Sequence, residues 1–303
     1  MTSKTSSAAG VREPEPATSA PAPAIRRRTR GAVVRSVLSQ TLLSLIALLF
    51  LVPIIWMVLS ALKPSAEVFT VPPKPFGSSI QFGNFADAWN YLPFGRFILN
   101  TIFVASVGTA ITLVASALSG YAFARLNFRF RGGLFVLYLS TLIVPQEVIV
   151  IPMFLVMQQL DWVNSYQALI LPWAFTAFGT FLLRQFFLSV PKELEEAAKL
   201  DGCGHLRILT RIFIPVSTAP LAVLAVFTFI GYWNSFLWPL IIISDTDKMT
   251  VPLGLQLFLG QQGQRWELLM AASTIAMVPT VALVLALQKY LVKGIALSGL
   301  GGR

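Results

Sequence analysis

Residues with reactive or metal-binding side chains are scarce in this chain of 303 residues. Its single cysteine is Cys203 and its single histidine is His205, so the sequence offers no intramolecular disulfide and no zinc site with three or four Cys/His ligands. Two positions apart, these residues point to different faces of a helix. The sequence contains no GxxxxGK[ST], HExxH or GxSxG motif. We predict no catalytic residue and no metal site, and any energy must come from a partner or a gradient.

The segment from Pro191 to Pro215 is the longest charged stretch between apolar runs. It predicts a helix, a glycine turn and a second helix, because Pro191 suits a first helical turn and Gly202 can take the left-handed conformation that ends a helix. Acidic residues follow Pro191, where the helix dipole favours carboxylates. Ala197 and Ala198 leave one face flat enough for close approach by another protein, and the adjacent glutamates can bind basic groups of that protein. The alternative is a solvated amphipathic loop without a partner.

The composition indicates that membrane-spanning helices position these residues. The chain is 55% hydrophobic and 12% charged, whereas an average soluble domain is about 45–50% apolar and about 25% charged. The net charge of +10 would suggest nucleic acid only if the basic residues formed a stripe on a folded surface. They cluster instead between long uncharged runs, as in the cytoplasmic loops of membrane proteins. We predict an integral membrane protein that binds no nucleic acid.

Six apolar runs are long enough to cross a bilayer, for which a helix needs about 20 residues. The sequence therefore predicts an all-α, polytopic protein with six transmembrane helices. The third run is interrupted by Pro145, Glu147 and Pro152. The runs cover residues 36–62, 97–124, 132–146 continued by 148–156, 162–183, 212–244 and 268–288.

The distribution of Lys and Arg predicts that both termini are cytoplasmic. With six spans, the side that holds the termini and the loops near 125–131 and 184–211 carries 18 of these residues, and the opposite side carries five. Residues 1–35 are expected to form a disordered Pro/Ala-rich cytoplasmic tail that ends in a basic cluster. Residues 36–303 are expected to form the six-span transmembrane domain.

Several segments resemble the permease subunits of ABC importers. The order Glu196-Ala197-Ala198, then Gly202, then Ile212-x-Ile214-Pro215 resembles the EAA motif of that family, whose usual pattern ends I-x-L-P. Further segments resemble the carbohydrate-uptake branch of the family, specifically its maltose-type second permease subunit. These segments are GYAFAR at 120–125, VP at 144–145, IP at 151–152, GYWNSF at 231–236, WPL at 238–240 and VKG at 292–294. The resemblance covers residues 36–303.

The resemblance implies a multi-pass permease of a prokaryotic plasma (inner) membrane that imports a sugar by alternating access of a central pathway. Its implied partners are a second, homologous permease subunit, two ATP-binding subunits that use ATP and Mg²⁺, and an extracytoplasmic solute-binding protein that meets loops 63–96 and 245–267. This chain itself would bind no cofactor. A cytoplasmic coupling helix between spans four and five would contact the ATPase. Its residues would be Glu195, Glu196, Ala197, Ala198, Gly202, Ile212 and Pro215.

Polar residues inside spans usually face the bundle interior or a water-filled cavity. Sugars bind well where a hydrogen-bonding side chain stands beside an aromatic face, because a pyranose ring offers both hydroxyls and C–H patches. The candidates for a substrate pathway are Asn100, Gln146, Glu147, Trp233 and Asn234, with Tyr232 and Trp238 near the last two. Alternatively, the tryptophans form an interfacial belt, Asn234 bonds a neighbouring helix, and Glu147 lies in the outer interface.

Two other classes of protein remain open on the sequence. An ATP-independent secondary transporter or channel would give the EAA-like segment no partner to bind. A polytopic membrane enzyme would need a cluster of ionisable residues at one interface, and the sequence supplies none outside 191–215.

Overall fold

The computed structural model describes residues 30–260 and 264–300, with side chains at 37–260 and 264–289. Every regular element within these ranges is helical, which confirms the all-α prediction. The chain divides into two compact units, residues 1–52 and 53–303. The first helix, α1, covers Arg30–Ala61 and contributes to both units. Residues 1–29 of the expected tail, and the side chains of its remainder, lie outside the described part.

Three helices in the described part are long and apolar enough to cross a membrane as single segments: α1 at Val37–Ala61, α3 (Phe94–Arg125), and α14 (Trp266–Leu300) over Trp266–Lys289. Three further pairs of helical segments pass the same test together but are bent at a short break, so the described helices provide up to six spans. The bent pairs are Arg131–Ile143 with Gln146–Gln159 (103°), Tyr166–Trp173 with Ala177–Ser189 (45°), and His205–Val216 with Thr218–Trp233 (83°).

Two of these breaks have local causes in the sequence. Val144 is extended because the following ring of Pro145 disfavours a helical conformation there, and this separates α4 (Arg131–Ser140) from α5 (Gln146–Gln159). Thr176 caps α7 (Ala177–Ser189) by accepting a hydrogen bond from the N–H of Phe178. The predicted run 212–244 is also divided, since α11 (Thr218–Trp233) ends before α12 (Leu237–Ile242) begins.

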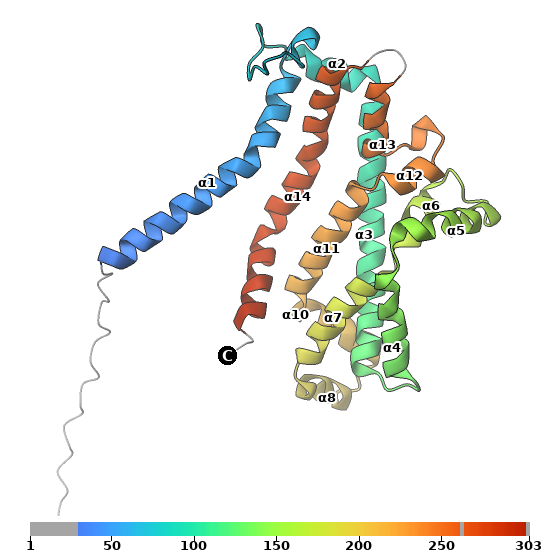
Figure 1. Ribbon diagram of the computed structural model, residues 1–303. Helices are drawn as coiled ribbons and strands as arrows, with labels where there is room; N and C mark the ends of the chain where they lie inside the picture. Colours follow the sequence, from blue (N-terminus) through green and yellow to red (C-terminus); the bar gives the residue numbers. More distant parts are fainter. Residues whose placement is uncertain (1–29, 261–263, 301–303) are drawn as a thin grey trace, which may run out of the picture. The chain divides into compact units, whose positions relative to one another are not determined.

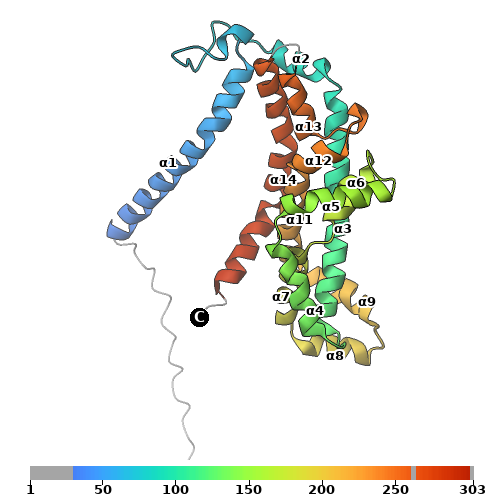
Figure 2. The ribbon, with the colours of Figure 1, turned by 45° about the vertical axis from the view of Figure 1, so that its right-hand side comes forward.

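Within residues 53–303, α3 packs along α7 and α11, and α14 packs against α11 and α2 (Gly83–Tyr91). Figures 1 and 2 both place α8 (Lys192–Leu200) at one end of α3 and α2 at the other, and we call these the α8 end and the α2 end. Gly108 allows α3 and α11 to approach closely, because a Cβ there would lie 2.5 Å from Cζ of Tyr232. The bundle therefore centres on α3.

The remaining elements are short and connect the long helices. They are α6 (Tyr166–Ile170), α9 (His205–Ile208), α10 (Ile214–Val216), α13 (Val251–Gln256), a π-helical turn at Leu209–Phe213, and 3₁₀ turns at Ser65–Glu67, Thr141–Ile143, Leu171–Trp173, Thr246–Lys248 and Leu257–Leu259.

Candidate functional site

The helix and glycine turn expected near residue 200 are present. Helix α8 begins after Pro191 and ends at Leu200. Gly202 has a φ of +76°, and the N–H groups of Gly202 and Cys203 donate to the carbonyls of Lys199 (3.0 Å) and Ala198 (2.9 Å). This pair of hydrogen bonds is a Schellman motif, which closes a helix where glycine supplies the left-handed residue. The turn therefore fixes the direction in which the chain leaves α8.

The two faces of α8 differ. Glu195 and Ala198 are buried against the bundle, with 5% and 8% of their surfaces exposed, whereas Glu196 and Ala197 are exposed. The prediction that Ala197 and Ala198 share one flat free face is wrong. Consecutive helical residues lie about 100° apart at 3.6 residues per turn, so the bundle covers one alanine and leaves the other free.

Arg125 attaches α8 to the bundle. Its Nε lies 3.8 Å from Oε2 of Glu195, and Nζ of Lys199 lies 2.8 Å from Oε1 of the same carboxylate. Nη2 of Arg125 donates to the carbonyls of Phe187 (2.6 Å) and Val190. The side chains of Arg125 and Glu195 are 5% and 7% exposed. One buried guanidinium therefore joins the end of α3, the end of α7 and α8.

The second half of the segment packs on the same end of α3. Tyr121 lies with its hydroxyl 3.3 Å from Nδ1 of His205 and its ring edge-on to Phe213, with the centroids 5.2 Å apart. The guanidinium of Arg125 also lies 5.1 Å from the Phe213 centroid. Of the remaining residues expected in the coupling segment, Ile212 is half-buried among these side chains and Pro215 is exposed. Residues 205–213 thus follow α8 as a second attachment to α3.

A cavity of about 380 Å³ lies among α5, α7, α11 and α12. Gln146 and Glu147, both expected in a substrate pathway, line it from the first turn of α5. The aromatic residues of the lining are Trp173, Phe178, Phe227, Tyr232, Phe236 and Trp238, and the other polar residues are Thr176, Thr228 and Ser235. Its size is within the range of small-molecule sites, roughly 300–1,000 Å³.

The polar atoms of the two most buried aromatic residues in the cavity lining, Tyr232 and Trp238, donate hydrogen bonds to backbone carbonyls. Nε1 of Trp238 donates to the carbonyl of Ala168 (2.8 Å), and the hydroxyl of Tyr232 donates to that of Ile170 (2.8 Å). Trp173 stands edge-on to Trp238, with the centroids 5.9 Å apart. Helix α6 therefore fixes these rings, which offer the cavity their apolar surfaces.

Trp233 and Asn234 do not line this cavity. Trp233 is 3% exposed and stacks on Phe229, with the centroids 5.7 Å apart. Asn234 is exposed at the end of α11, and its side chain forms no hydrogen bond within the described residues. The neighbours Tyr232 and Ser235 face the cavity instead, because the helix ends between them and the chain turns.

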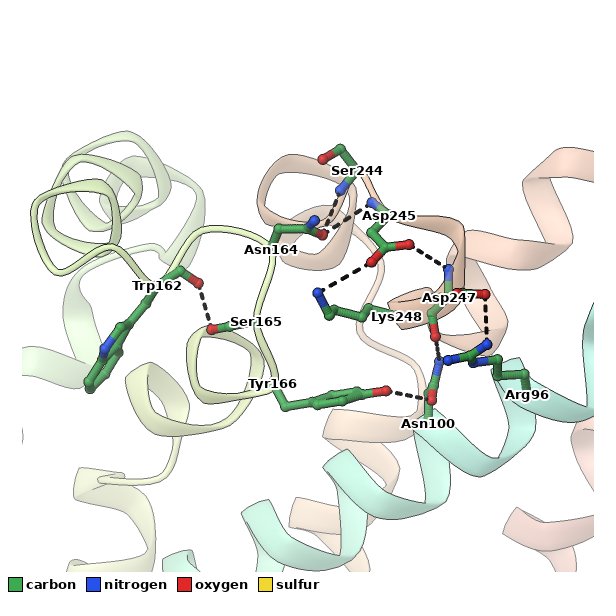
Figure 3. A network of polar contacts seen from close by, with 10 residues as sticks. All are labelled: Arg96, Asn100, Trp162, Asn164, Ser165, Tyr166, Ser244, Asp245, Asp247 and Lys248. Carbon is green, nitrogen blue, oxygen red and sulfur yellow. Dashed lines mark hydrogen bonds and ion pairs between the residues drawn. The ribbon is translucent and has the colours of Figure 1, made fainter.

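Asn100 also lies away from the cavity, at the α2 end, and its amide is fully occupied. Its Nδ2 donates to the carbonyls of Asp247 (2.8 Å) and Met249 (2.9 Å), while its Oδ1 accepts from the hydroxyl of Tyr166 (2.8 Å). Arg96 pairs with Asp247 at 2.8 Å. Figure 3 shows this arrangement, in which Asn100 ties segment 245–249 to α3 and α6.

A second asparagine holds the same segment. Oδ1 of Asn164 accepts from the N–H groups of Ser244 (3.3 Å) and Asp245 (3.1 Å) (Figure 3). The carboxylate of Asp245 in turn accepts from the N–H of Asp247 (2.9 Å) and lies 3.3 Å from Nζ of Lys248. These interactions favour the ionised carboxylate, first the backbone hydrogen bond and then Lys248, and hold the pKa of Asp245 below its ordinary value.

No role was predicted from the sequence for Arg125, Tyr121, Thr228 or Ser235. Arg125 and Tyr121 belong to the stretch 120–125 that carried part of the resemblance, yet a basic residue that ends an apolar run usually lies in the membrane interface. Thr228 lies inside an apolar run without a motif around it. No sequence signal distinguishes such a hydroxyl from one that bonds its own helix.

Comparison with protein families gives a match to the model described as "Binding-protein-dependent transport system inner membrane component" over residues 112–297. The probable ABC transporter permease protein YurM of Bacillus subtilis (strain 168) is 37% identical over 256 residues, which cover 82% of this chain and 83% of that protein. The arabinooligosaccharides transport system permease protein AraQ of Halalkalibacterium halodurans is 32% identical over 262 residues, with 85% and 93% coverage. The sn-glycerol-3-phosphate transport system permease protein UgpE of Pectobacterium atrosepticum is 36% identical over 244 residues, with 78% and 87% coverage.

The fold is similar to that of a chain in the crystal structure of a bacterial ABC transporter involved in the import of the acidic polysaccharide alginate. The TM-score is 0.75 at 23% sequence identity, and the match covers 87% of this chain and 98% of that chain. A second structure, the bacterial alginate ABC transporter in complex with an alginate pentasaccharide-bound periplasmic protein, matches with a TM-score of 0.61 and 19% identity over 86% and 96% of the chains. These two likenesses concern the fold.

Proposed function

Because the chain belongs to the family of binding-protein-dependent transport system inner membrane components, we propose that it is one of two permease subunits of an ATP-driven sugar importer. The resemblance seen in the sequence motifs is confirmed at the level of the family. The curated relatives are named as transport permeases, so the chain is a transport subunit and not an enzyme. Their names do not favour an ATP-independent transporter or channel, and they include carriers of sugars and of a glycerol phosphate.

The proposed membrane arrangement has six spans: three single helices and three bent pairs. Both termini and the α8 end would be cytosolic, and the α2 end would face the solute-binding protein. The supporting observation is the excess of Lys and Arg at the termini and around residues 125–131 and 184–211. In this arrangement residues 1–35 are the cytoplasmic tail and residues 36–303 the transmembrane domain.

The proposed role of α8 is to couple the permease to a partner ATPase. One observation carries this proposal: Arg125 and Glu195 fix one face of α8 to the bundle, while Glu196 and Ala197 on the other face remain exposed. Two ATP-binding subunits would hold ATP and Mg²⁺ and dock on this face and its counterpart in the second permease. When they close, a displaced α8 would move α3 through Arg125, and Gly202 would keep the angle of the turn fixed.

Alternating access would then follow from rigid movement of the two permeases about a shared pathway, as in other transporters. Of the residues expected in the pathway, Gln146 and Glu147 line the cavity in this chain. Asn100 is better assigned to holding segment 245–249, because all of its amide groups are already bonded. Trp233 is assigned to packing, and Asn234 stays a pathway residue only if the second permease subunit faces it.

The experiment that tests the coupling role places a large side chain on the exposed face of α8. Ala197→Trp removes no contact within this chain, so the variant should insert into the membrane normally. We expect loss of ATPase co-purification and of transport, because the added ring blocks close approach of the ATPase to the exposed face of α8.

The matched control is Ala86→Trp, the same change at an exposed alanine of α2 at the opposite end. That variant should still co-purify with the ATPase. Normal ATPase binding and transport by Ala197→Trp would refute the coupling role of α8.

A further inference from the structure

We propose that the cavity among α5, α7, α11 and α12 selects uncharged sugars, with the Glu147 carboxylate accepting hydrogen bonds from solute hydroxyls and repelling anionic solutes. This inference rests on the proposed function, which leaves the charge of the solute open. It concerns the part of the pathway that this chain contributes.

The cavity lining supplies polar groups without partners. Gln146, Glu147, Thr228 and Ser235 line the cavity, and their side chains form no hydrogen bond or ion pair within the described residues. The side chains of Gln146 and Glu147 are exposed and those of Thr228 and Ser235 are half-buried, whereas the buried amide of Asn100 is bonded within the chain. Polar groups that line a cavity in this state are available to a ligand, and together they offer both donors and acceptors.

Apolar ring surface lies beside those polar groups in the cavity lining. The polar tips of Tyr232 and Trp238 are bonded to backbone carbonyls of α6, so these residues present ring surface to the cavity. A fixed aromatic ring can pack against the C–H patches of a pyranose while nearby oxygens and amides bind its hydroxyls. Hydroxyl-rich solutes with apolar ring faces fit this combination better than purely polar or purely apolar ones.

The charged groups of the cavity lining are all of one sign. Glu147 is its one carboxylate, and the described lining contains no Lys, Arg or His. Glu147 lies in the first turn of α5, where the helix dipole stabilises a negative charge. A phosphate, sulfate or uronate group would meet this carboxylate without a cation to offset the repulsion, and juxtaposed like charges suppress binding. A neutral sugar would meet only an acceptor for its hydroxyls.

The test measures binding to the complete importer, purified with its partner subunits in lipid nanodiscs and without the solute-binding protein. Ligand-observed NMR gives dissociation constants for neutral probes (maltotriose and xylotriose) and for anionic probes (trigalacturonate and sn-glycerol 3-phosphate). The wild-type complex should bind a neutral probe more tightly than the anionic ones. Glu147→Gln keeps the shape of the side chain and removes its charge, so this preference should fall by roughly tenfold or more.

The matched control is Asp161→Asn, which removes one exposed carboxylate just beyond the other end of α5. Asn tolerates the left-handed conformation of this position, where φ is 55°. The control should leave the neutral-to-anionic preference unchanged. An unchanged preference in Glu147→Gln, or an equal change in Asp161→Asn, would overturn the assignment of Glu147.

A second variant covers the case in which Glu147→Gln does not assemble. Thr228→Val preserves the shape of the side chain and removes the hydroxyl, and it should weaken binding of the neutral probe about 2- to 10-fold. Unchanged binding in Thr228→Val, or no binding of any neutral probe by a wild-type complex that still transports, would refute the cavity as the sugar site. A complex without ATP-driven transport would instead contradict the proposed function.

Discussion

Polar side chains gather both at the α8 end and around the cavity, but they pair within the chain at the α8 end and have no partner in it around the cavity. At the α8 end, the buried Arg125 lies 3.8 Å from the carboxylate of Glu195 and donates to two backbone carbonyls, and Lys199 pairs with the same carboxylate at 2.8 Å. In the cavity, Glu147 and Thr228 have no partner within the described residues. The first arrangement transmits force between elements, and the second leaves groups available to a solute.

This difference separates the residues that determine stability from the residues that determine which solute binds. Residues that satisfy one another within the chain should mainly affect folding and coupling when they are changed, because a lost partner leaves a buried group unpaired. Residues without a partner in the chain should affect what the protein binds and leave its stability nearly unchanged. Three predictions test this division, and they follow in order of decreasing expected effect.

The largest effect is expected from Arg125→Ala. The change removes one of the two cations beside the buried Glu195, which keeps Lys199, and frees the carbonyls of Phe187 and Val190. Losing two charge-assisted hydrogen bonds, each of which contributes about 1.5–3 kcal/mol, costs about 3–5 kcal/mol. We expect a loss of this order in the free energy of unfolding, measured by denaturant titration in mixed micelles, together with loss of transport.

Arg129→Ala is the control for this prediction. Arg129 is exposed and its guanidinium lies over the ring of Phe130, 4.7 Å from the centroid. Its removal should change stability by less than about 0.5 kcal/mol. A similarly small change in Arg125→Ala would mean that α8 is not attached to the bundle through this residue.

An intermediate effect is expected from Asn100→Ala, with Asn234→Ala as its counterpart. Asn100 makes three hydrogen bonds, and their loss should weaken the attachment of segment 245–249 by about 1–3 kcal/mol. The hydrogen-exchange rates of the amides in 245–249 should therefore increase. Asn234 forms none within the described residues, so its replacement should leave exchange and stability unchanged. Equal changes of exchange and stability in the two variants would contradict the distinction between an asparagine bonded within the chain and one without a partner in it.

The smallest effect is expected from acidification of segment 245–249. The pKa of Asp245 is lower in the folded chain than in the unfolded chain. Its contribution to the stability of the segment is therefore present above the unfolded pKa and is lost as the pH falls through the folded pKa. Exchange protection of the Asp247 amide, corrected for intrinsic rates, should decrease over that acidic range. Asp245→Ala should lower the protection at neutral pH and remove its pH dependence. Persistence of this pH dependence in Asp245→Ala would assign the titration to another group.

The sequence was informative where one residue type has one local consequence. Gly202 ends α8 with a positive φ as expected, because glycine alone lacks a steric penalty there. Pro145 predicted an interruption of the third run, and the chain bends by 103° at that place. The sequence was less informative about Asn100 and Asn234, which are the same residue type in similar apolar surroundings but end in different environments.

The sequence by itself determined that the chain is helical and apolar, which family it belongs to, and where its charged segment breaks into a helix and a glycine turn. These properties depend on composition, on spacing and on conformational preferences over a few neighbouring residues. Only the tertiary structure decided that Arg125 holds Glu195, that Ala198 is covered while Ala197 is free, and that Gln146 and Glu147 share a cavity with Thr228. Such pairings depend on how helices distant in the chain pack and rotate against one another, and a hydrophobic pattern fixes neither the partner nor the rotation closely enough to place single atoms.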